Sequence, residues 1–233
     1  GALSVYDTNP RQFGRGQLQA LADLGEIAQK ELMTSELREA QSELISKLGI
    51  ARRQASLDAL TRIWTRRAGL QLLRASLEQA REAGHSVAVC MADIDHFKSI
   101  NDEQGHQTGD QVLRKIAAQV VSSLRSGDIV CRYGGDELLL VLEDIDRDTL
   151  IEVAGRLCER VAEYPVRTRS GNVSASLSVG AVLAGPRAGG TLEDLIAKAD
   201  RAMYRAKQEG RNRAVVVGEN GLALRGPSAL ATA

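Results

Sequence analysis

The sequence lacks several features that would place it in a broad class of protein. Basic and acidic side chains balance at 30 each, which argues against general nucleic-acid binding, since that function usually needs a basic excess. No run of about eighteen apolar residues occurs, so no membrane span is predicted. Only three cysteines occur, and none has metal-ligand spacing. Because Cys90, Cys131 and Cys158 lie in apolar stretches, we expect core thiols in a reducing compartment.

The beginning of the chain has no secretion-signal pattern and starts at Gly1 instead of Met. Its 233 residues, 43% of them hydrophobic, suit one large domain with a helical extension. We therefore expect a piece of a longer, cytoplasmic protein. The pattern divides it into the end of another domain, a long helix, a compact domain and a mobile tail rich in small residues, at 1–15, 16–57, 58–217 and 218–233.

Residues 16–57 contain no proline and follow a helical pattern. A narrow heptad seam runs through its second half at Leu37, Gln41, Leu44, Leu48, Ala51 and Ala55. A narrow seam on so long a helix favours a parallel coiled-coil dimer over a helix that packs on its own domain. Gly25 and Gly49 count against a stable helix, because glycine weakens helix interiors.

Helices and strands alternate beyond the long helix. Helices are predicted at 66–83, 109–125, 147–163 and 191–210, the last with Thr191 as N-cap and Gly210 as its stop. Strands are predicted at 86–95, 128–133, 137–144, 173–183 and 214–218. The Gly-Gly pair between two of these strands predicts a hairpin with a two-residue turn. Alternation with an internal hairpin predicts an α/β sandwich with a mixed, largely antiparallel sheet flanked by helices.

Two pairs of acids lie at the ends of apolar strands. Asp93 and Asp95 end the central strand, and Asp136 and Glu137 follow the two glycines. Clustered carboxylates repel one another unless a cation neutralises them, and Mg²⁺ is usually held by one or two carboxylates plus substrate phosphates. The pattern therefore suggests a Mg²⁺ site that includes the carbonyl of Ile94. The alternative is that these acids only decorate turns.

Polar residues after the central strand could bind a nucleotide. Lys98 could hold phosphates, and Asn101 and Asp110 could read a base, since a carboxylate accepts two N–H bonds from guanine that adenine cannot supply. Taken alone, the segment reads as a polar loop with a helix N-cap at Thr108.

A pair of basic residues lies near the end of the last helix. Lys207 and Arg211 are four residues apart and so share a helix face, where they could clamp phosphates. A basic helix C-terminus that complements the helix dipole explains them equally well.

These segments together resemble the GGDEF family of diguanylate cyclases. The motifs are DALTRIWTRR at 58–67, DIDHFKSIND at 93–102, GHQTGD at 105–110, GGDEL at 134–138 and AKADRAMYRAKQEGRN at 197–212. The resemblance covers about residues 56–217, and five motifs in order make it specific. It implies a fold similar to adenylyl cyclase and polymerase palm domains, in agreement with the α/β prediction.

The resemblance also implies a reaction. Two GTP molecules, one on each domain of a homodimer, would condense to cyclic di-GMP with release of two pyrophosphates. Metal ligands would be Asp93, Asp136 and the Ile94 carbonyl, with Mg²⁺ or Mn²⁺ bound. Glu137 would bind a second metal or activate the hydroxyl, which makes Asp93, Asp136 and Glu137 the expected catalytic acids.

Substrate-binding residues follow from the same motifs. They are Asn101, Asp110, Lys98, His96, Phe97, Gly134, Gly135, Lys207 and Arg211. The resemblance assigns guanine to the first two and phosphates to the three basic residues. Gly134 and Gly135 would let the hairpin backbone lie close to the nucleotide.

RSGD at 125–128 matches the RxxD inhibitory motif of the family. Arg125 and Asp128 would bind the product, since arginine pairs with phosphate and stacks on guanine. Arg156 on the following helix would assist. The alternative is an exposed arginine and a turn aspartate, because short RxxD matches are common.

Some positions depart from the family pattern. Leu138 replaces the usual Phe and is expected to pack under the hairpin without loss of activity. Arg62, Ile63 and Thr65 replace a common Gly, Leu and Asn in the opening motif, which questions the turn geometry there but not the chemistry. Asp110 keeps the carboxylate expected for GTP selectivity.

Upstream, about thirty residues resemble the end of a GAF sensor domain, which would make the long helix a signalling linker. Two rival functions remain. One is a non-catalytic cyclic di-GMP receptor that works through Arg125 and Asp128, and the other is a dimerisation module. Neither explains the acids and Lys207, so we predict a diguanylate cyclase with product inhibition.

Overall fold

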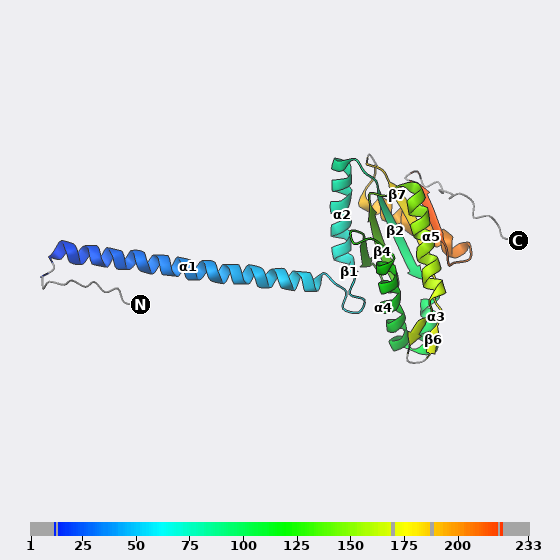
Figure 1. The fold of residues 1–233 in the computed structure, drawn as a ribbon, viewed down its shortest axis with the longest axis horizontal. Coiled ribbons are helices and arrows are strands. Elements are labelled where there is room, and N and C mark those ends of the chain that lie inside the picture. The colour runs from blue at the N-terminus through cyan, green and yellow to red at the C-terminus, as the bar shows by residue number, and fades with distance from the viewer. Residues whose placement is uncertain (1–11, 13, 169–170, 187–188, 219, 221–233) are drawn as a thin grey trace. The chain divides into compact units, whose positions relative to one another are not determined.

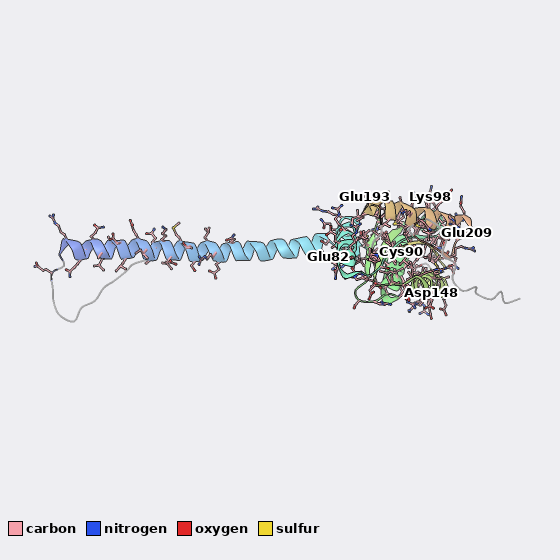
Figure 2. All side chains as sticks on the ribbon, turned by 90° about the horizontal axis from the view of Figure 1, so that it is seen from above. Glu82, Cys90, Lys98, Asp148, Glu193 and Glu209 are labelled. Carbon is pink, nitrogen blue, oxygen red and sulfur yellow. The ribbon has the colours of Figure 1, made fainter. Side chains whose placement is uncertain are left out.

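The computed structural model describes residues 12, 14–168, 171–186, 189–218 and 220, which form two compact units. The first, ending at Gln54, is essentially helix α1, Arg15–Ala55. Figure 2 shows side chains on opposite sides of the first part of this helix. Its large exposed apolar side chains are Leu18, Leu24, Ile27, Leu32, Met33 and Leu37. The side chains of the seam residues Leu44, Leu48, Ala51 and Ala55 lie outside the described part of the chain, as do most of residues 1–15 and most of the predicted tail.

A six-stranded sheet forms the centre of the second unit (Figure 1). Its order is β1 (Trp64–Thr65), β3 (Ile129–Arg132), β4 (Glu137–Glu143), β2 (Val87–Ile94), β7 (Leu177–Ala184) and β8 (Ala214–Gly218). The two outer pairs, β1–β3 and β7–β8, are parallel, and the three inner pairs are antiparallel. The predicted mixed, largely antiparallel sheet is therefore confirmed. A separate ribbon pairs β5 (Val166–Thr168) with β6 (Gly171–Val173).

Helices cover both faces of the sheet because alternate strand residues point to opposite sides. Ala88, Cys90 and Ala92 of β2 pack in one apolar cluster with α3 (Phe97–Gln104), α4 (His106–Ser122) and α5 (Arg147–Glu163). Val87, Val89 and Met91 pack in a second cluster with α2 (Arg66–Ala83) and α6 (Leu192–Gln208). All eight residues of β2 are buried, as the continuous apolar run predicts.

The segment after β2 differs from its prediction. Residues predicted as a polar loop form α3, and α4 begins at His106 after Gly105, whose φ of 82° reverses the chain between the two helices. Thr108 is buried inside α4 and is therefore not the N-cap. Helix α3 has only eight residues, and Ile100 is its buried residue. A helix with one buried position has no apolar repeat, so the sequence pattern did not reveal it.

The hairpin is also looser than predicted. Four residues, Tyr133 to Asp136, separate β3 from β4, and the Tyr133 N–H donates to the Glu137 carbonyl at 2.8 Å. Neither Gly134 nor Gly135 has the left-handed φ that the primed two-residue turns require, so that turn prediction is wrong. Leu138 is fully buried beneath the hairpin, as predicted.

Other local predictions hold. Thr191 caps α6 by accepting the Asp194 N–H at 3.1 Å, while the Asp194 carboxylate accepts the Thr191 N–H at 2.9 Å. Cys90, Cys131 and Cys158 are free and buried, and burial raises the pKa of each thiol to about 12, which makes them unreactive core residues.

No helix in the described ranges is long and apolar enough to cross a membrane.

Candidate active site

Three carboxylates gather where β2 and β4 meet at one edge of the sheet. The antiparallel register places Asp93 directly opposite Glu137, so both side chains lie on the face covered by α2 and α6. The Asp136 carbonyl accepts the Ile94 N–H at 3.4 Å, which keeps the third acid beside the end of β2. Asp93 therefore lies beside the hairpin acids, with Glu137 instead of Asp136 as its cross-strand partner, whereas Asp95 bonds Ser176 and Ser178 instead.

A lysine from α6 lies among these acids. The Lys207 Nζ is 2.8 Å from Asp93 Oδ1, and both side chains are largely buried. Burial raises the pKa of Asp93, Lys207 acts against this rise, and the charges of Asp136 and Glu137 add to it. One ammonium group therefore faces three carboxylates, and the edge retains an excess of negative charge.

The donor set of this edge fits a hard divalent cation. Asp93, Asp136, Glu137 and the Ile94 backbone offer oxygen ligands of the kind that Mg²⁺ prefers. Among the described residues, no group of three or more acidic, histidine or cysteine side chains is placed to hold a metal ion by itself. Since Mg²⁺ usually completes its shell with substrate phosphates and water, a partial protein set suits a nucleotide site.

An arginine that the sequence analysis did not single out holds the hairpin in place. The Arg132 guanidinium donates to the Gly135 carbonyl at 2.9 and 3.1 Å and pairs with Asp58 at 3.2 Å. Partial burial acts to raise the pKa of Asp58, but hydrogen bonds from Thr61 and the charge of Arg132 hold it below its usual value. Arg132 therefore ties the loop bearing Asp136 to the segment that opens the domain.

The two hairpin glycines have different surroundings. A Cβ added at Gly134 would overlap the Glu137 carboxylate, whereas a Cβ at Gly135 would meet nothing within 4 Å. A side chain at position 134 would therefore displace the Glu137 carboxylate. Space for a nucleotide remains the predicted role of Gly135.

The two predicted base-reading residues come together through the reversal at Gly105. Asn101 lies on α3 and Asp110 on the first turns of α4. A Cβ added at Gly109 would overlap the Asn101 Oδ1, so the Asn101 side chain lies directly against the backbone beside Asp110. Gly109, which sequence reasoning did not single out although it lies within the GHQTGD motif, therefore leaves the space that the Asn101 side chain occupies.

The remaining substrate-binding candidates are more scattered. Lys98 on α3 and Arg211 after α6 are exposed, as a phosphate contact requires. Phe97 packs against the apolar core, and its role in binding remains a prediction. His96 has a left-handed φ of 56° and lines a cavity of about 620 Å³ with Ser99, Asn172 and Ser176.

A second cavity contains the RxxD residues. Arg125, Asp128 and Arg156 line a hollow of about 420 Å³, together with Arg160. Asp128 accepts the backbone N–H of Arg125 at 2.9 Å, and Arg156 donates to the Ser123 carbonyl at 3.4 Å. Asp128 therefore fixes the turn that carries Arg125, and three guanidinium groups surround a single hollow.

Comparison with known proteins gives consistent matches. The profile of the family described as "Diguanylate cyclase, GGDEF domain" matches residues 55–213. Diguanylate cyclase DosC of Escherichia coli strain K12 is 34% identical over 184 residues, which are 76% of this chain and 40% of DosC. Response regulator PleD of Caulobacter vibrioides is 37% identical over 165 residues, 69% of this chain and 36% of PleD. The chain thus spans well under half the length of these relatives.

Solved structures agree with these matches. The coiled coil and GGDEF domain of DgcB from Caulobacter crescentus, in complex with c-di-GMP, superposes with a TM-score of 0.72 at 28% identity, covering 80% of this chain and 98% of that one. Diguanylate cyclase SiaD from Pseudomonas aeruginosa, in complex with its activator SiaC, gives a TM-score of 0.68 at 31% identity, with coverage of 87% and 78%.

Proposed function

Because this chain belongs to the GGDEF family of diguanylate cyclase domains, we propose that it condenses two GTP molecules into cyclic di-GMP and two pyrophosphates. The observation that carries the proposal is the cross-strand pair of Asp93 and Glu137, with Lys207 2.8 Å from Asp93. A pure binding module has no need for three carboxylates and a buried cation at one sheet edge.

The acids would act through a divalent cation. Asp93, Asp136 and the Ile94 carbonyl would hold Mg²⁺ or Mn²⁺, with Glu137 as ligand to a second ion or as base for the hydroxyl. Bound there, the metal would neutralise phosphate charge and lower the pKa of the 3′-hydroxyl of GTP. Glu137 is well placed for its role because Gly134 leaves room for its carboxylate.

The basic residues would orient the substrate. Lys207 would exchange part of its contact with Asp93 for a phosphate oxygen when GTP binds, with Arg211 and Lys98 at the other phosphates. Asp110 would accept hydrogen bonds from the N–H groups of the guanine edge, and the Asn101 amide would donate and accept there. Positioning of this kind supplies much of the acceleration in phosphoryl transfer, because the attacking oxygen and the leaving group must be in line.

Each domain would bind one GTP, so the reaction requires two domains that face each other. The exposed leucines, Ile27 and Met33 of α1 support dimerisation through this helix, since apolar residues on a long helix are usually covered by a partner. In this proposal α1 links the cyclase to an upstream sensor. The similar DgcB structure also contains a coiled coil together with its GGDEF domain.

Product would bind at the RxxD hollow and hold the domains apart. Arg125, Arg156 and Arg160 supply the guanidinium groups for phosphate and guanine, and Asp128 orders the turn. A cyclic di-GMP receptor without catalysis, which is the rival function, would bind the nucleotide at the same hollow.

Product analysis tests the proposal. The protein is incubated with GTP and Mg²⁺, and nucleotides are separated by chromatography and identified by mass, beside an Asp136→Ala/Glu137→Ala variant. Cyclic di-GMP from the parent alone assigns the chemistry to the hairpin. A receptor is identified instead if the folded protein makes no product and does not bind GTP but binds cyclic di-GMP. That binding should then be lost in Arg125→Ala.

A further inference from the structure

Asp95 is a buried acid two residues beyond Asp93 that the proposed mechanism does not use. We propose that Asp95 is a positioning residue, whose carboxylate anchors the turn between α6 and β8 so that Lys207 and Arg211 face the phosphates of GTP. The inference rests on the proposed function for its ligand. The anchor itself rests only on the contacts of Asp95.

Neutral donors surround this carboxylate. Ser176 Oγ donates to Oδ2 at 2.6 Å, Ser178 Oγ donates to Oδ1 at 2.7 Å, and the Asn212 N–H donates to Oδ2 at 3.1 Å. Asp95 is 3% exposed, and within the described parts of the chain no cation forms an ion pair with it. Burying a carboxylate that only neutral groups bind costs desolvation free energy. Packing alone does not explain an acid at this position.

The turn that Asp95 anchors has an unusual backbone. Gly210, Arg211 and Asn212 have φ values of 113°, 61° and 47°, three successive left-handed residues of which two are not glycine. Such a conformation persists only where its surroundings fix it. The Arg211 N–H donates to the Ala206 carbonyl at 3.0 Å, and the next N–H, that of Asn212, donates to Asp95.

Two contacts therefore tie the end of β2 to the end of α6. Lys207 pairs with Asp93, and Asn212 pairs with Asp95, at positions flanking Arg211 in the chain. Ser176 and Ser178 bind the same carboxylate at the start of β7. The Val179 N–H of β7 also donates to the Arg213 carbonyl, just after the turn, at 2.9 Å. Asp95 thus fixes the metal-binding strand and the phosphate-binding turn relative to each other.

Binding of a non-hydrolysable GTP analogue and of GMP tests the inference, with Asp148→Asn on α5 as the matched control. Asp95→Ala should weaken GTP-analogue binding about tenfold or more and GMP binding less than about threefold, because GMP lacks the terminal phosphates. Asp95→Asn keeps one acceptor oxygen for Asn212, and the serine hydroxyls can accept from its amide, so it should stay within about threefold of the parent for both ligands.

A double-mutant cycle gives the sharper result. In an Arg211→Ala background, Asp95→Ala should weaken GTP-analogue binding by a smaller factor than it does in the parent, because the contribution through Arg211 is already lost and only that through Lys207 remains. Three results would overturn the inference. The fold-losses in affinity of Asp95→Ala and Arg211→Ala could multiply in the double variant, Asp95→Ala could weaken GMP and GTP-analogue binding equally, or well-folded Asp95→Asn could lose much of its affinity for the GTP analogue.

Amide hydrogen exchange separates this inference from the proposed function. The Asn212 N–H should exchange slowly in the parent without nucleotide and rapidly in Asp95→Ala. Rapid exchange in the parent contradicts the anchor even if the protein makes cyclic di-GMP, and slow exchange supports it even if the parent makes none.

Discussion

Asp93 is a carboxylate whose surroundings disfavour its ionised form and so lower the stability of the folded protein at neutral pH. Burial and two neighbouring acids raise the pKa of Asp93, so its ionised form is less favourable in the folded protein than in the unfolded chain. A group with a raised folded pKa contributes stability below its unfolded pKa, near 3.8, and loses that contribution as the pH rises through the folded pKa.

Asp93→Asn should therefore unfold at an equal or higher temperature than the parent at neutral pH, by ~2–4 °C for each kcal/mol gained. The gain should shrink as the pH falls toward 3.8, where the parent carboxyl also becomes neutral. Thermal unfolding of both proteins across this pH range measures it. A clearly lower unfolding temperature for the variant at pH 7 would mean that the Lys207 pair outweighs burial and repulsion.

Gly109 leaves the room that the Asn101 side chain occupies, and the proposed function assigns Asn101 to guanine. A Cβ at Gly109 would overlap Asn101 Oδ1, so Gly109→Ala must displace that side chain. We expect KM for GTP to rise roughly tenfold or more, as for the loss of a polar contact of ~1–3 kcal/mol, with weaker preference for GTP over ATP.

Gly155→Ala on α5 is the matched control, because its Cβ would meet nothing within 4 Å. It should leave KM unchanged and stabilise the helix by roughly 0.5–1 kcal/mol. If Gly109→Ala keeps the parent KM and selectivity, Asn101 is not the base-reading residue.

At the scale of elements, the hairpin and the domain opening act as one unit. Arg132 bonds both the Gly135 carbonyl and Asp58, so Arg132→Lys, which lacks the planar fork, should lower kcat about 10- to 100-fold by letting the acids shift. Asp58→Asn should reproduce part of the loss. Arg205→Lys alters only an exposed helix pair with Glu209 and should have no effect. Parent-like turnover by Arg132→Lys would show that the hairpin holds itself.

The elements also show how far sequence reasoning reaches. The buried run of β2, the ranges of α2, α5 and β8, and the Thr191 cap follow from local patterns, which tertiary structure did not override. By contrast, α3 has one buried residue, and the turn at Asp136 is set by Arg132, whose partner Asp58 is 74 positions away. The contacts of Asp95, Gly109 and Arg132 depend on such distant pairings, so no local pattern reveals them.

For the molecule as a whole, the proposed chemistry requires two copies. The GGDEF family prediction is confirmed, whereas the GAF-like beginning and the signalling role of α1 remain predictions. Specific activity should fall on dilution as the dimer separates, and Leu32→Glu on α1 should shift this fall to higher protein concentration, because Leu32 is 63% exposed on the single chain. Activity per chain that stays constant while sedimentation reports a monomer would contradict the dimeric mechanism.

The most direct test of the account is cyclic di-GMP formation as Mg²⁺ is added to metal-free protein and GTP, for the parent and Asp93→Asn side by side. The account predicts no product without a divalent cation, saturable product formation by the parent, and a loss on the order of 10³-fold in the variant. Product formed without a divalent cation, or at parental rates by folded Asp93→Asn, would contradict it.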